Sequence, residues 1–462
     1  MPNALATLAN AAGKIARLGL QAAGRGATAL PGLVTLQLDH NYITAVTRAL
    51  PHGVVLVSGT NGKTTTARML SDITRAAGWS PIHNRSGSNL ERGIAGALLA
   101  DSTWRGEPRG DVGLFEVDEA SLPRVLRRLT PRALVITNLF RDQLDRFFEI
   151  DQLARHIGDA IAQLDPGCTL ILNADDPIVA MLSARHRGAV VYFGVDDPAA
   201  GGTIPQTISD ATRCPRCKAP LHYERVILAH EGDWSCPSCA FARPGRDVSA
   251  VRVRLEAAAS EIDLRAPAGP IDPIRVPLPG LYNAYNALAA IAIARALDIA
   301  LPTAARAIAA FRPAFGRLEQ LPVAGRLVRL VLVKNPAGFN AAIGALLDTG
   351  RAPRLLAALN DRDADGRDVS WIWDADFESF AHAIEHVVAT GIRSRDLANR
   401  LKYAGVPRER IEVVDGWGGA IDRAVGGVAP GGELVVIATY TAMLALRGEL
   451  ARRGHVAPFW ED

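Results

Sequence analysis

The amino-acid sequence predicts an α/β protein with two domains, each built on a mostly parallel sheet. From residue 51 to about residue 200, and again after about residue 325, short apolar runs of strand length alternate with helical patterns. A glycine-bearing turn follows the first strand, and two pairs of cysteines interrupt the first alternation. Such alternation is typical of parallel sheets flanked by helices, which bind ligands at the carboxyl ends of their strands.

Residues 1–50 have a weakly amphipathic helical pattern, and we expect them to form a helical approach to the first strand. The first 25 residues lack the continuous apolar core of a signal peptide, and no run of about 18 apolar residues could cross a bilayer. We therefore expect a cytoplasmic protein. For residues 14–25 a solvated helix is favoured, and peripheral contact with the inner face of the membrane stays open.

The first strand, residues 53–58, leads into a turn and then a helix that ends near residue 77. The turn and the helix start are Gly59, Thr60, Asn61, Gly62, Lys63, Thr64 and Thr65. Glycines let successive N–H groups face one concavity, and the helix adds the positive end of its dipole. Lys63 would reach the terminal phosphates of a nucleotide, and the Thr64 hydroxyl would bind Mg²⁺. The usual motif has glycine at position 57, where this chain has Val57, and an ordinary glycine-rich turn is the less favoured alternative.

Further strands are expected at residues 112–117, 133–137 and 169–172, with a helix at 151–164. Glu116 ends the first of these strands, and neighbouring parallel strands end at the same edge of a sheet. Carboxylates are ligands that Mg²⁺ prefers, so Glu116 is predicted to be a second protein ligand of this ion. A solvated acidic turn is the alternative interpretation.

Two CxxC pairs, Cys214 with Cys217 and Cys236 with Cys239, are separated by 18 residues. Four thiolates at this spacing can bind Zn²⁺ tetrahedrally, and a site with four sulfur ligands is structural because no coordination position stays open. The ion would stabilise a zinc-ribbon insertion at residues 205–245. Disulfide bonds are the alternative, but a cytoplasmic protein keeps its thiols reduced.

Beyond residue 248 the α/β alternation is expected to resume, with a helix at 283–297. The first sheet domain would span residues 51–314, and proline and glycine residues between positions 312 and 325 mark the start of a second α/β domain at 315–462. Strands of that domain are expected at residues 327–333, 354–359, 385–389 and 433–438.

The composition is that of a globular protein, with 48% hydrophobic and 21% charged residues among 462. The formal net charge is only +3, and residues of both signs are interspersed, so a nucleic-acid partner is not expected. Lysine occurs only five times, and none lies between Lys63 and Lys218.

Gly-Thr-Asn-Gly-Lys-Thr-Thr-Thr at residues 59–66 resembles the phosphate loop of the Mur ligase family. Further strings follow in that family's order: Thr-Asn-Leu at 137–139, Asp-Gln-Leu-Asp at 142–145, Asn-Ala-Asp-Asp-Pro at 173–177, Gly-Leu-Tyr-Asn-Ala-Tyr-Asn at 280–286 and Gly-Arg-Leu-Glu at 316–319. The resemblance implies a central ATPase domain, a Rossmann-like C-terminal domain, and ATP and Mg²⁺ as cofactors. In the family, the residues equivalent to Asn283 and Arg317 contact the nucleotide.

The cysteine insertion and the strings at 334–340 and 365–374 resemble one branch of this family, the ligase subunits of lipid II isoglutaminyl synthases. That resemblance implies ATP-dependent amidation of the D-glutamate α-carboxylate in the stem peptide of lipid II, through an acyl phosphate, at the inner membrane face. Ammonia would come from a GatD-like glutaminase subunit in a heterodimer.

Three residues of the second domain follow from the same resemblance. Asp368, and after it Asp365, could orient a histidine of the partner glutaminase, although a turn role is an equal alternative for both. Lys334 would position or neutralise the substrate or the intermediate, with a surface lysine as an equal alternative. The chain offers no amidotransferase nucleophile of its own, because Cys168 lacks the required histidine context.

Two other functions stay open. A conventional Mur or folylpolyglutamate-type ligase would add an amino acid, but this chain has no lysine between positions 63 and 218 to match the carbamylated lysine of many such enzymes. A non-catalytic nucleotide-binding scaffold would recruit other molecules, and Glu116 and Arg317 at family positions disfavour it.

Overall fold

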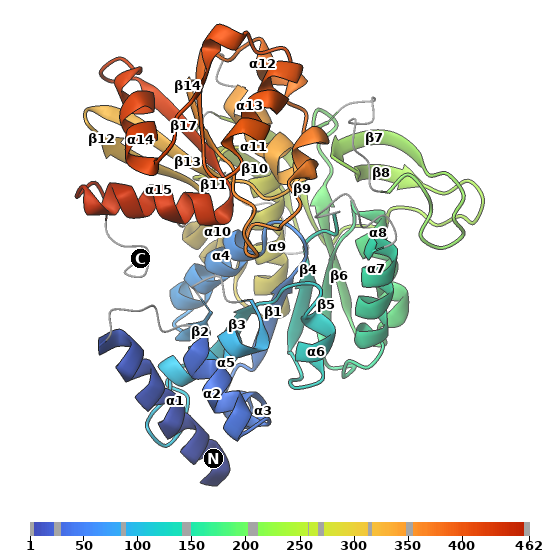
Figure 1. Cartoon of the computed structure of the whole chain (residues 1–462). Helices are drawn as coiled ribbons and strands as arrows, with labels where there is room; N and C mark the ends of the chain where they lie inside the picture. Colours follow the sequence, from blue (N-terminus) through green and yellow to red (C-terminus); the bar gives the residue numbers. More distant parts are fainter. Residues whose placement is uncertain are drawn as a thin grey trace.

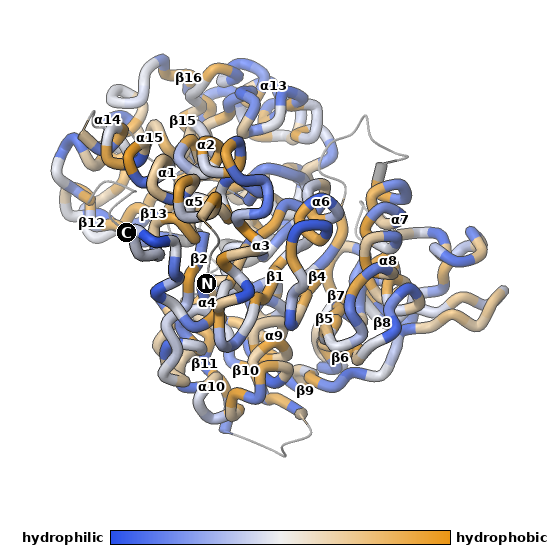
Figure 2. Tube along the Cα trace, turned by 90° about the horizontal axis from the view of Figure 1, so that it is seen from below, coloured by the Kyte–Doolittle hydropathy of each residue, from blue (hydrophilic) through white to orange (hydrophobic). Residues whose placement is uncertain are grey.

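A computed structural model gives the arrangement of the chain in Figure 1. It describes residues 4–22, 29–84, 89–140, 149–201, 211–256, 258–266, 272–312, 317–347 and 354–456. Helices α1 (Ala4–Ala22), α2 (Leu30–Leu38) and α3 (Tyr42–Thr47) precede the first strand. They pack on α5 (Glu91–Ala100), and Figure 2 shows α1, α2 and α5 side by side.

The first sheet has nine strands in the order β11-β10-β9-β6-β5-β4-β1-β3-β2. The pairs from β2 to β9 are parallel, whereas β9, β10 and β11 pair antiparallel. Its strands are β1 (Val54–Ser58), β2 (Pro81–His83), β3 (Val112–Glu116), β4 (Ala133–Ile136), β5 (Thr169–Asn173), β6 (Val190–Val195), β9 (Val248–Leu255), β10 (Ser260–Arg265) and β11 (Ile274–Val276). The other helical segments of this part are α4 (Lys63–Ala76), α6 (Leu122–Leu126), α7 (Glu149–Ile161), α8 (Pro177–Met181), η1 (Leu182–Arg185), α9 (Leu281–Ala296) and α10 (Leu301–Ala309).

Both faces of this sheet are covered, as its central strand shows. All five residues of β1 are buried. Val55 and Val57 belong to the core beneath α4 and α9, whereas Val54 and Leu56 belong to the core beneath α3, α5 and α7. Side chains alternate between the two faces of a strand, and a strand buried on both faces is continuously apolar.

The second sheet has six strands in the order β12-β13-β17-β14-β15-β16, and only the edge strand β12 is antiparallel to its neighbour. Its strands are β12 (Arg317–Val323), β13 (Arg326–Leu332), β14 (Arg354–Ala358), β15 (His386–Thr390), β16 (Ile411–Val413) and β17 (Glu433–Ala438). Its helical segments are α11 (Pro336–Leu347), η2 (Ser370–Trp373), α12 (Glu378–Ala381), α13 (Ser394–Tyr403), η3 (Arg408–Arg410), α14 (Trp417–Gly426) and α15 (Tyr440–Arg452). A separate hairpin, β7 (His222–Leu228) and β8 (Glu231–Ser235), projects at the right of Figure 1.

The α/β class with parallel-rich sheets is therefore confirmed. The expected helix at 283–297 is confirmed as α9. The expected alternation is wrong for residues 248–276, because β9, β10 and β11 follow one another as an antiparallel extension of the first sheet. The expected boundary at 314/315 and the start of the insertion at residue 205 lie outside the described residues. The division into segments 1–50, 51–314 and 315–462 stays a prediction.

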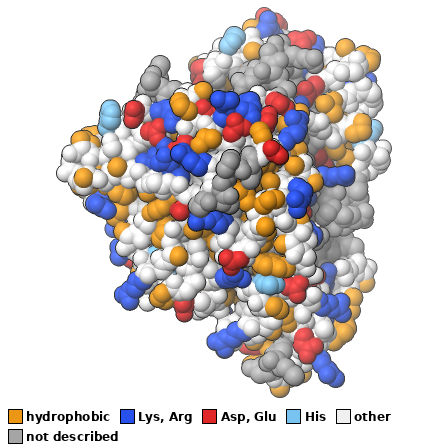
Figure 3. All heavy atoms as spheres, turned by 180° about the vertical axis from the view of Figure 1, so that it is seen from behind, with side chains coloured by type: hydrophobic (Ala, Val, Ile, Leu, Met, Phe, Trp, Pro, Cys, Tyr) orange, Lys and Arg blue, Asp and Glu red, His pale blue; other side chains and the backbone are white. Residues whose placement is uncertain are grey.

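The surface carries mixed charges. On the face in Figure 3, Lys and Arg side chains are interspersed with Asp and Glu, as the small net charge leads one to expect. None of the helices in the described part of the chain combines the length and the apolar character that crossing a bilayer requires.

Candidate nucleotide and zinc sites

Two glycines shape the loop between β1 and α4. Gly59 has a φ of 126° and Gly62 a φ of 86°, conformations that other residues rarely adopt. A Cβ atom at Gly59 would lie 2.3 Å from Thr137 Oγ1, and one at Gly62 would lie 2.1 Å from Asn286 Oδ1. Both positions therefore require glycine for two independent reasons, backbone angle and space.

The residues that follow β4 hold this loop in place. The N–H groups of Thr60 and Asn61 donate to the carbonyl oxygen and Oδ1 of Asn138, at 2.9 and 2.8 Å. Thr137 Oγ1 donates to the carbonyl oxygen of Asn61 at 2.7 Å. The first N–H groups of α4 lack partners inside the helix, as at every helix N-terminus, and can bind phosphate. The loop thus has the shape and the donors that a nucleotide phosphate requires.

Lys63 is a buried cation at the start of α4. Its Nζ donates to the carbonyl oxygen of Gly59, to that of Thr60 at 3.1 Å and to Glu119 Oε2 at 2.9 Å. Burial lowers the pKa of Lys63, but the negative charges of Glu119 and Glu116 outweigh it and the pKa is raised. Burial likewise raises the pKa of Glu119, but Lys63 and then Lys334 outweigh it and the pKa is lowered. Lys63 and Glu119 are therefore both ionised at neutral pH.

The predicted magnesium ligands lie in direct contact. Thr64 Oγ1 donates to Glu116 Oε2 at 2.7 Å. Asn84 fixes the backbone of Glu116, because its Nδ2 donates to the carbonyl oxygen of Glu116 at 2.8 Å and its Oδ1 accepts from the N–H of Glu116 at 2.9 Å. A hydroxyl and a carboxylate are the hard oxygen ligands that Mg²⁺ takes alongside water and phosphate oxygens, so this pair of residues fits the ion.

The N-terminus of α9 also reaches the loop. Asn283 is buried, and its Nδ2 donates to the carbonyl oxygen of Pro279 at 2.8 Å. Its Oδ1 accepts from Asn286 Nδ2 at 3.1 Å, and Asn286 Oδ1 accepts from Thr66 Oγ1 at 3.5 Å. Asn286, which sequence reasoning did not single out, therefore connects Asn283 to α4.

The second domain contacts the loop through the residues after β13. Asn335 is buried, and its Nδ2 donates to Asn61 Oδ1 at 3.2 Å. The adjacent Lys334 is half-buried, and its charge lowers the pKa values of Asp118 and Glu119. The pKa of Asp118 is nevertheless raised, because burial and the charge of Glu119 outweigh the effect of the lysines. Lys334 thus lies within electrostatic range of the acidic end of β3.

The two aspartates proposed for the partner interface differ in their surroundings. Asp365 is buried, and its carboxylate accepts from the N–H of Thr441 at 2.6 Å and from Thr441 Oγ1 at 2.5 Å, at the start of α15. Asp368 is partly exposed and accepts from the N–H of Ser370 at 2.8 Å, at the start of η2. Asp365 thus stabilises the second domain, whereas Asp368 lies at the surface.

Two sequence expectations fall outside the described parts of the chain. Arg317 begins β12, but its side chain lies outside the described residues. The Asp-Gln-Leu-Asp string at 142–145 lies outside them entirely.

The four cysteines form one cluster. The Sγ atoms of Cys214, Cys217, Cys236 and Cys239 all lie within 4.8 Å of one another. Two of the Sγ–Sγ distances are 3.6 Å (Cys214 to Cys239) and 3.5 Å (Cys217 to Cys236). Zn–S bonds of about 2.3 Å at tetrahedral angles place sulfurs about 3.8 Å apart, so this cluster fits a structural zinc ion.

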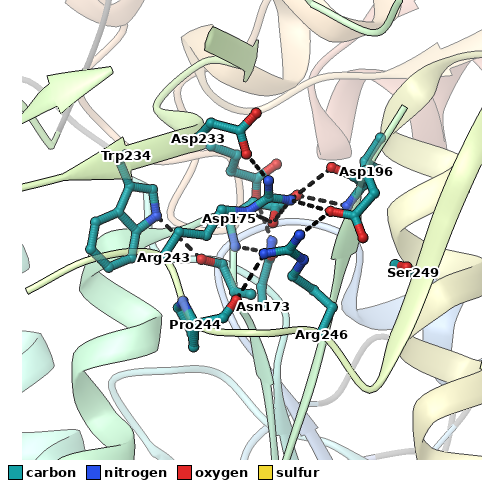
Figure 4. Close-up of polar contacts among 12 residues, drawn as sticks. Asn173, Asp175, Asp196, Asp233, Trp234, Arg243, Pro244, Arg246 and Ser249 are labelled. Atoms are coloured by element: carbon teal, nitrogen blue, oxygen red, sulfur yellow. Dashed lines mark hydrogen bonds and ion pairs between the residues drawn. The ribbon is translucent and has the colours of Figure 1, made fainter. Parts of the chain in front are cut away.

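Ion pairs and hydrogen bonds anchor the hairpin on the end of β5, as Figure 4 shows. Asp175 accepts from Arg243 Nε at 2.8 Å, from Tyr285 Oη at 2.6 Å and from the N–H of Val195 at 2.8 Å. Arg243 also pairs with Asp233 of β8, and Trp234 Nε1 donates to the carbonyl oxygen of Ala174 at 3.2 Å. The insertion is therefore bonded into the first sheet domain.

Glu231 connects this hairpin to the loop side of the sheet. It is buried, and its Oε1 accepts from Asn173 Nδ2 at 2.8 Å. The same Nδ2 donates to the carbonyl oxygen of Thr137 at 3.1 Å, next to the phosphate loop. Burial, and then the charges of Asp176 and Asp175, raise the pKa of Glu231 well above its ordinary value. Burial and the neighbouring carboxylates thus disfavour the ionised form of this side chain.

Comparisons with known proteins agree with this geometry. Two protein-family models match, the Mur ligase middle domain at residues 57–213 and the MurT ligase C-terminal domain at residues 332–443. The chain is 34% identical over 455 residues to the MurT subunit of the glutamine-hydrolyzing lipid II isoglutaminyl synthase of Streptococcus pneumoniae, covering 98% of each protein. It is 34% identical over 400 residues to the MurT subunit of Staphylococcus aureus, covering 85% of this chain and 86% of that protein.

Solved structures share the fold at lower identity. MurF of Acinetobacter baumannii has a TM-score of 0.67 at 18% identity and covers 91% of this chain and 81% of its own. A pseudomurein peptide ligase of Methanothermus fervidus has a TM-score of 0.66 at 22% identity, covering 87% of this chain and 78% of that one. Folylpolyglutamate synthase of Mycobacterium tuberculosis, solved with ADP, has a TM-score of 0.63 at 18% identity. The match covers 89% of this chain and 92% of the synthase chain.

Proposed function

Because this chain belongs to the MurT family of Mur ligases, we propose that it is the ATP-dependent subunit that amidates lipid II. The proposed reaction converts the D-glutamate α-carboxylate of the stem peptide to an amide. A carboxylate oxygen attacks the γ-phosphorus of ATP, which gives an acyl phosphate and ADP. Ammonia then attacks the acyl carbon, the bond to the phosphate oxygen breaks, and inorganic phosphate and a proton leave.

The observation that carries this proposal is the placement of charge around the phosphate loop. Lys63 supplies a buried positive charge beside the loop, where it would neutralise charge on the phosphoryl group during transfer. Thr64 and Glu116 would hold Mg²⁺, which when bound supplies further charge to the phosphate oxygens. Asn283, through Asn286, and Arg317 would contribute to the nucleotide site.

The second domain would complete the site from the opposite side. Asn335 contacts the phosphate loop at Asn61, and the adjacent Lys334 would meet the acid group of the substrate beside the γ-phosphate. We assign Lys334 the neutralisation of the carboxylate or of the acyl phosphate. The half-buried position of this lysine beside Asp118 and Glu119 supports this role over that of a solvated surface lysine.

A separate glutaminase would supply the ammonia. The cysteine outside the metal cluster, Cys168, is buried, and burial and the charge of Asp165 raise the pKa of its thiol to about 12. A thiol of this kind cannot act as a nucleophile at neutral pH. In the proposed complex, a GatD-like partner carries the cysteine and histidine, and the partly exposed Asp368 orients that histidine.

One experiment tests the proposal against its alternatives. The purified chain is incubated with Mg-ATP, lipid II and either ammonium or an amino acid, and the mass of the lipid-linked product is measured. Conversion to the amide with ammonium alone supports amidation. Addition of an amino acid residue would instead show a conventional peptide-type ligase, and no ATP-dependent product in either case would show a scaffold. Omission of ATP is the matched control.

A further inference from the structure

Helix α1 exposes large apolar side chains to solvent. Leu8 is 67% exposed, Ile15 64% and Leu18 55%, and their spacing of seven and three residues places them on one side of the helix. The opposite side packs against α2 and α5, and its buried residues are Ala6, Ala9, Asn10 and Gly13. An apolar side that faces water on a packed helix marks a surface that another partner covers.

Cationic and aromatic residues border this apolar side. Lys14 Nζ donates to the carbonyl oxygens of Leu99 and Ser102, both at 2.8 Å, and lies 5.9 Å from the ring centre of Trp104. Trp104 is itself 54% exposed, and the neighbouring Arg105 is exposed. Tryptophan beside basic residues at the edge of an apolar helix face is typical of helices that lie at the membrane–water interface.

The charge of this part of the chain is mainly positive, although Asp101 also acts on Lys14. Residues 1–38 include Lys14, Arg17 and Arg25 but no aspartate or glutamate. Arg109 and Arg17 lie close enough to Lys14 for their charges, after burial, to lower its pKa. Two such faces brought together would place cations against cations, so a second copy of the chain is a poor occupant. An anionic surface is electrostatically complementary to it.

We propose that the apolar side of α1, together with Trp104, docks on an anionic phospholipid surface. This inference deepens the proposed function and rests on it in one respect: the proposed substrate is linked to a lipid and therefore lies at such a surface. The apolar side chains would enter the boundary between headgroups and acyl chains, while Arg105 contacts the lipid phosphates. Figure 1 shows α1 at the end of the molecule opposite the second sheet, where a flat surface could approach it.

The test uses the full chain without ATP, partner or lipid II. Sedimentation with vesicles of phosphatidylcholine containing phosphatidylglycerol is compared with pure phosphatidylcholine vesicles. We expect binding to the anionic vesicles that weakens as salt is added. The double change Leu8→Ser with Ile15→Ser should weaken it about tenfold or more, since two exposed side chains lose their insertion. Leu255→Ser with Ile392→Ser, at two exposed apolar positions elsewhere, is the matched control and should bind as the unchanged chain does.

Several outcomes would overturn the docking surface. Two of these are absence of vesicle binding and equal binding by both double variants. The third is a dimer in solution that dissociates to monomers in the α1 double variant but not in the control variant, which would assign the face to a second copy of the chain. Thermal melting confirms that each variant is folded. Vesicle binding without any amidation would refute the proposed function alone. Amidation by the α1 variant that is normal in detergent micelles but reduced on vesicles would support both proposals.

Discussion

Replacing Glu231 by glutamine should stabilise the protein at neutral pH. Glu231 is buried at the start of β8, and its Oε2 has no hydrogen-bond partner among the described residues. Its Oε1 accepts from Asn173, a bond that a glutamine carbonyl can also accept. The change therefore keeps the shape and that contact but removes the ability to ionise beside Asp175 and Asp176.

The size of the effect follows from proton linkage. Burial and the neighbouring carboxylates raise the pKa of Glu231 in the folded state well above its unfolded value, so between these two pKa values the folded chain holds a proton that the unfolded chain has released. The free energy of unfolding then falls with rising pH, by up to about 1.4 kcal/mol per unit above the unfolded pKa of about 4.3. Between pH 5 and pH 7, Glu231 therefore lowers the free energy of unfolding by at most about 3 kcal/mol. The glutamine variant does not show this decrease.

The assay is thermal or urea unfolding of both proteins at several values between pH 5 and pH 8. We expect the stability difference between variant and unchanged chain to grow steadily as the pH rises. Glu261→Gln is the matched control, because Glu261 is partly exposed and its hydrogen bond with Arg254 lowers its pKa. A difference that is the same at pH 5 and pH 8 would refute the reasoning, since it would show that Glu231 is ionised in the folded protein.

Four further predictions concern the proposed sites. Lys63→Ala should lower ATP-dependent amidation at least about a hundredfold. It should also destabilise the fold, because Glu119 loses its buried partner. Initial rates and thermal melts measure the two effects, and unchanged ATP turnover would contradict the first. Asp368→Asn should abolish glutamine-dependent amidation with the glutaminase partner while ammonium still supports it, and equal loss of both activities would make the residue structural. Asp365→Asn should instead lower stability by about 1–2 kcal/mol through its bonds to Thr441, measured by urea unfolding. Elemental analysis should find one zinc per chain, and its removal by a chelator should lower the melting temperature; a chain purified without metal that melts at the same temperature would contradict the zinc site.

The phosphate loop and the cysteine cluster could be predicted because their defining residues are neighbours in sequence. Two glycines with positive φ and an adjacent lysine make the loop, and each cysteine pair lies within four residues. The sequence alone did not show which residues contact the loop from distant parts of the chain. Glu119, Asn286 and Asn335 contact it across sequence separations of 56, 220 and 274 residues. Asn286 and Asn335 lie inside strings noted in the sequence and Glu119 follows a predicted strand, but the sequence does not show which side chains face the loop.

The antiparallel extension of the first sheet was missed for a different reason. Residues of β10 alternate between buried and more exposed positions, the pattern of a strand with one solvated face. That period of two was present in the sequence at 260–265, where Ser, Ile and Leu alternate with charged residues. An alternation of continuously apolar strands with helices does not include such a strand, because its solvated face interrupts the apolar run.

The bonds made by Asp175 determine how far the cysteine-bearing insertion can be treated as a detachable module. Arg243, which follows the last cysteine, shares this carboxylate with Tyr285 of α9 and Val195 of β6. A shortened protein that joined β6 directly to β9 would leave a buried acid facing a tyrosine hydroxyl with no guanidinium to neutralise it. Any evolutionary loss or laboratory deletion of the insertion therefore demands a compensating change at position 175.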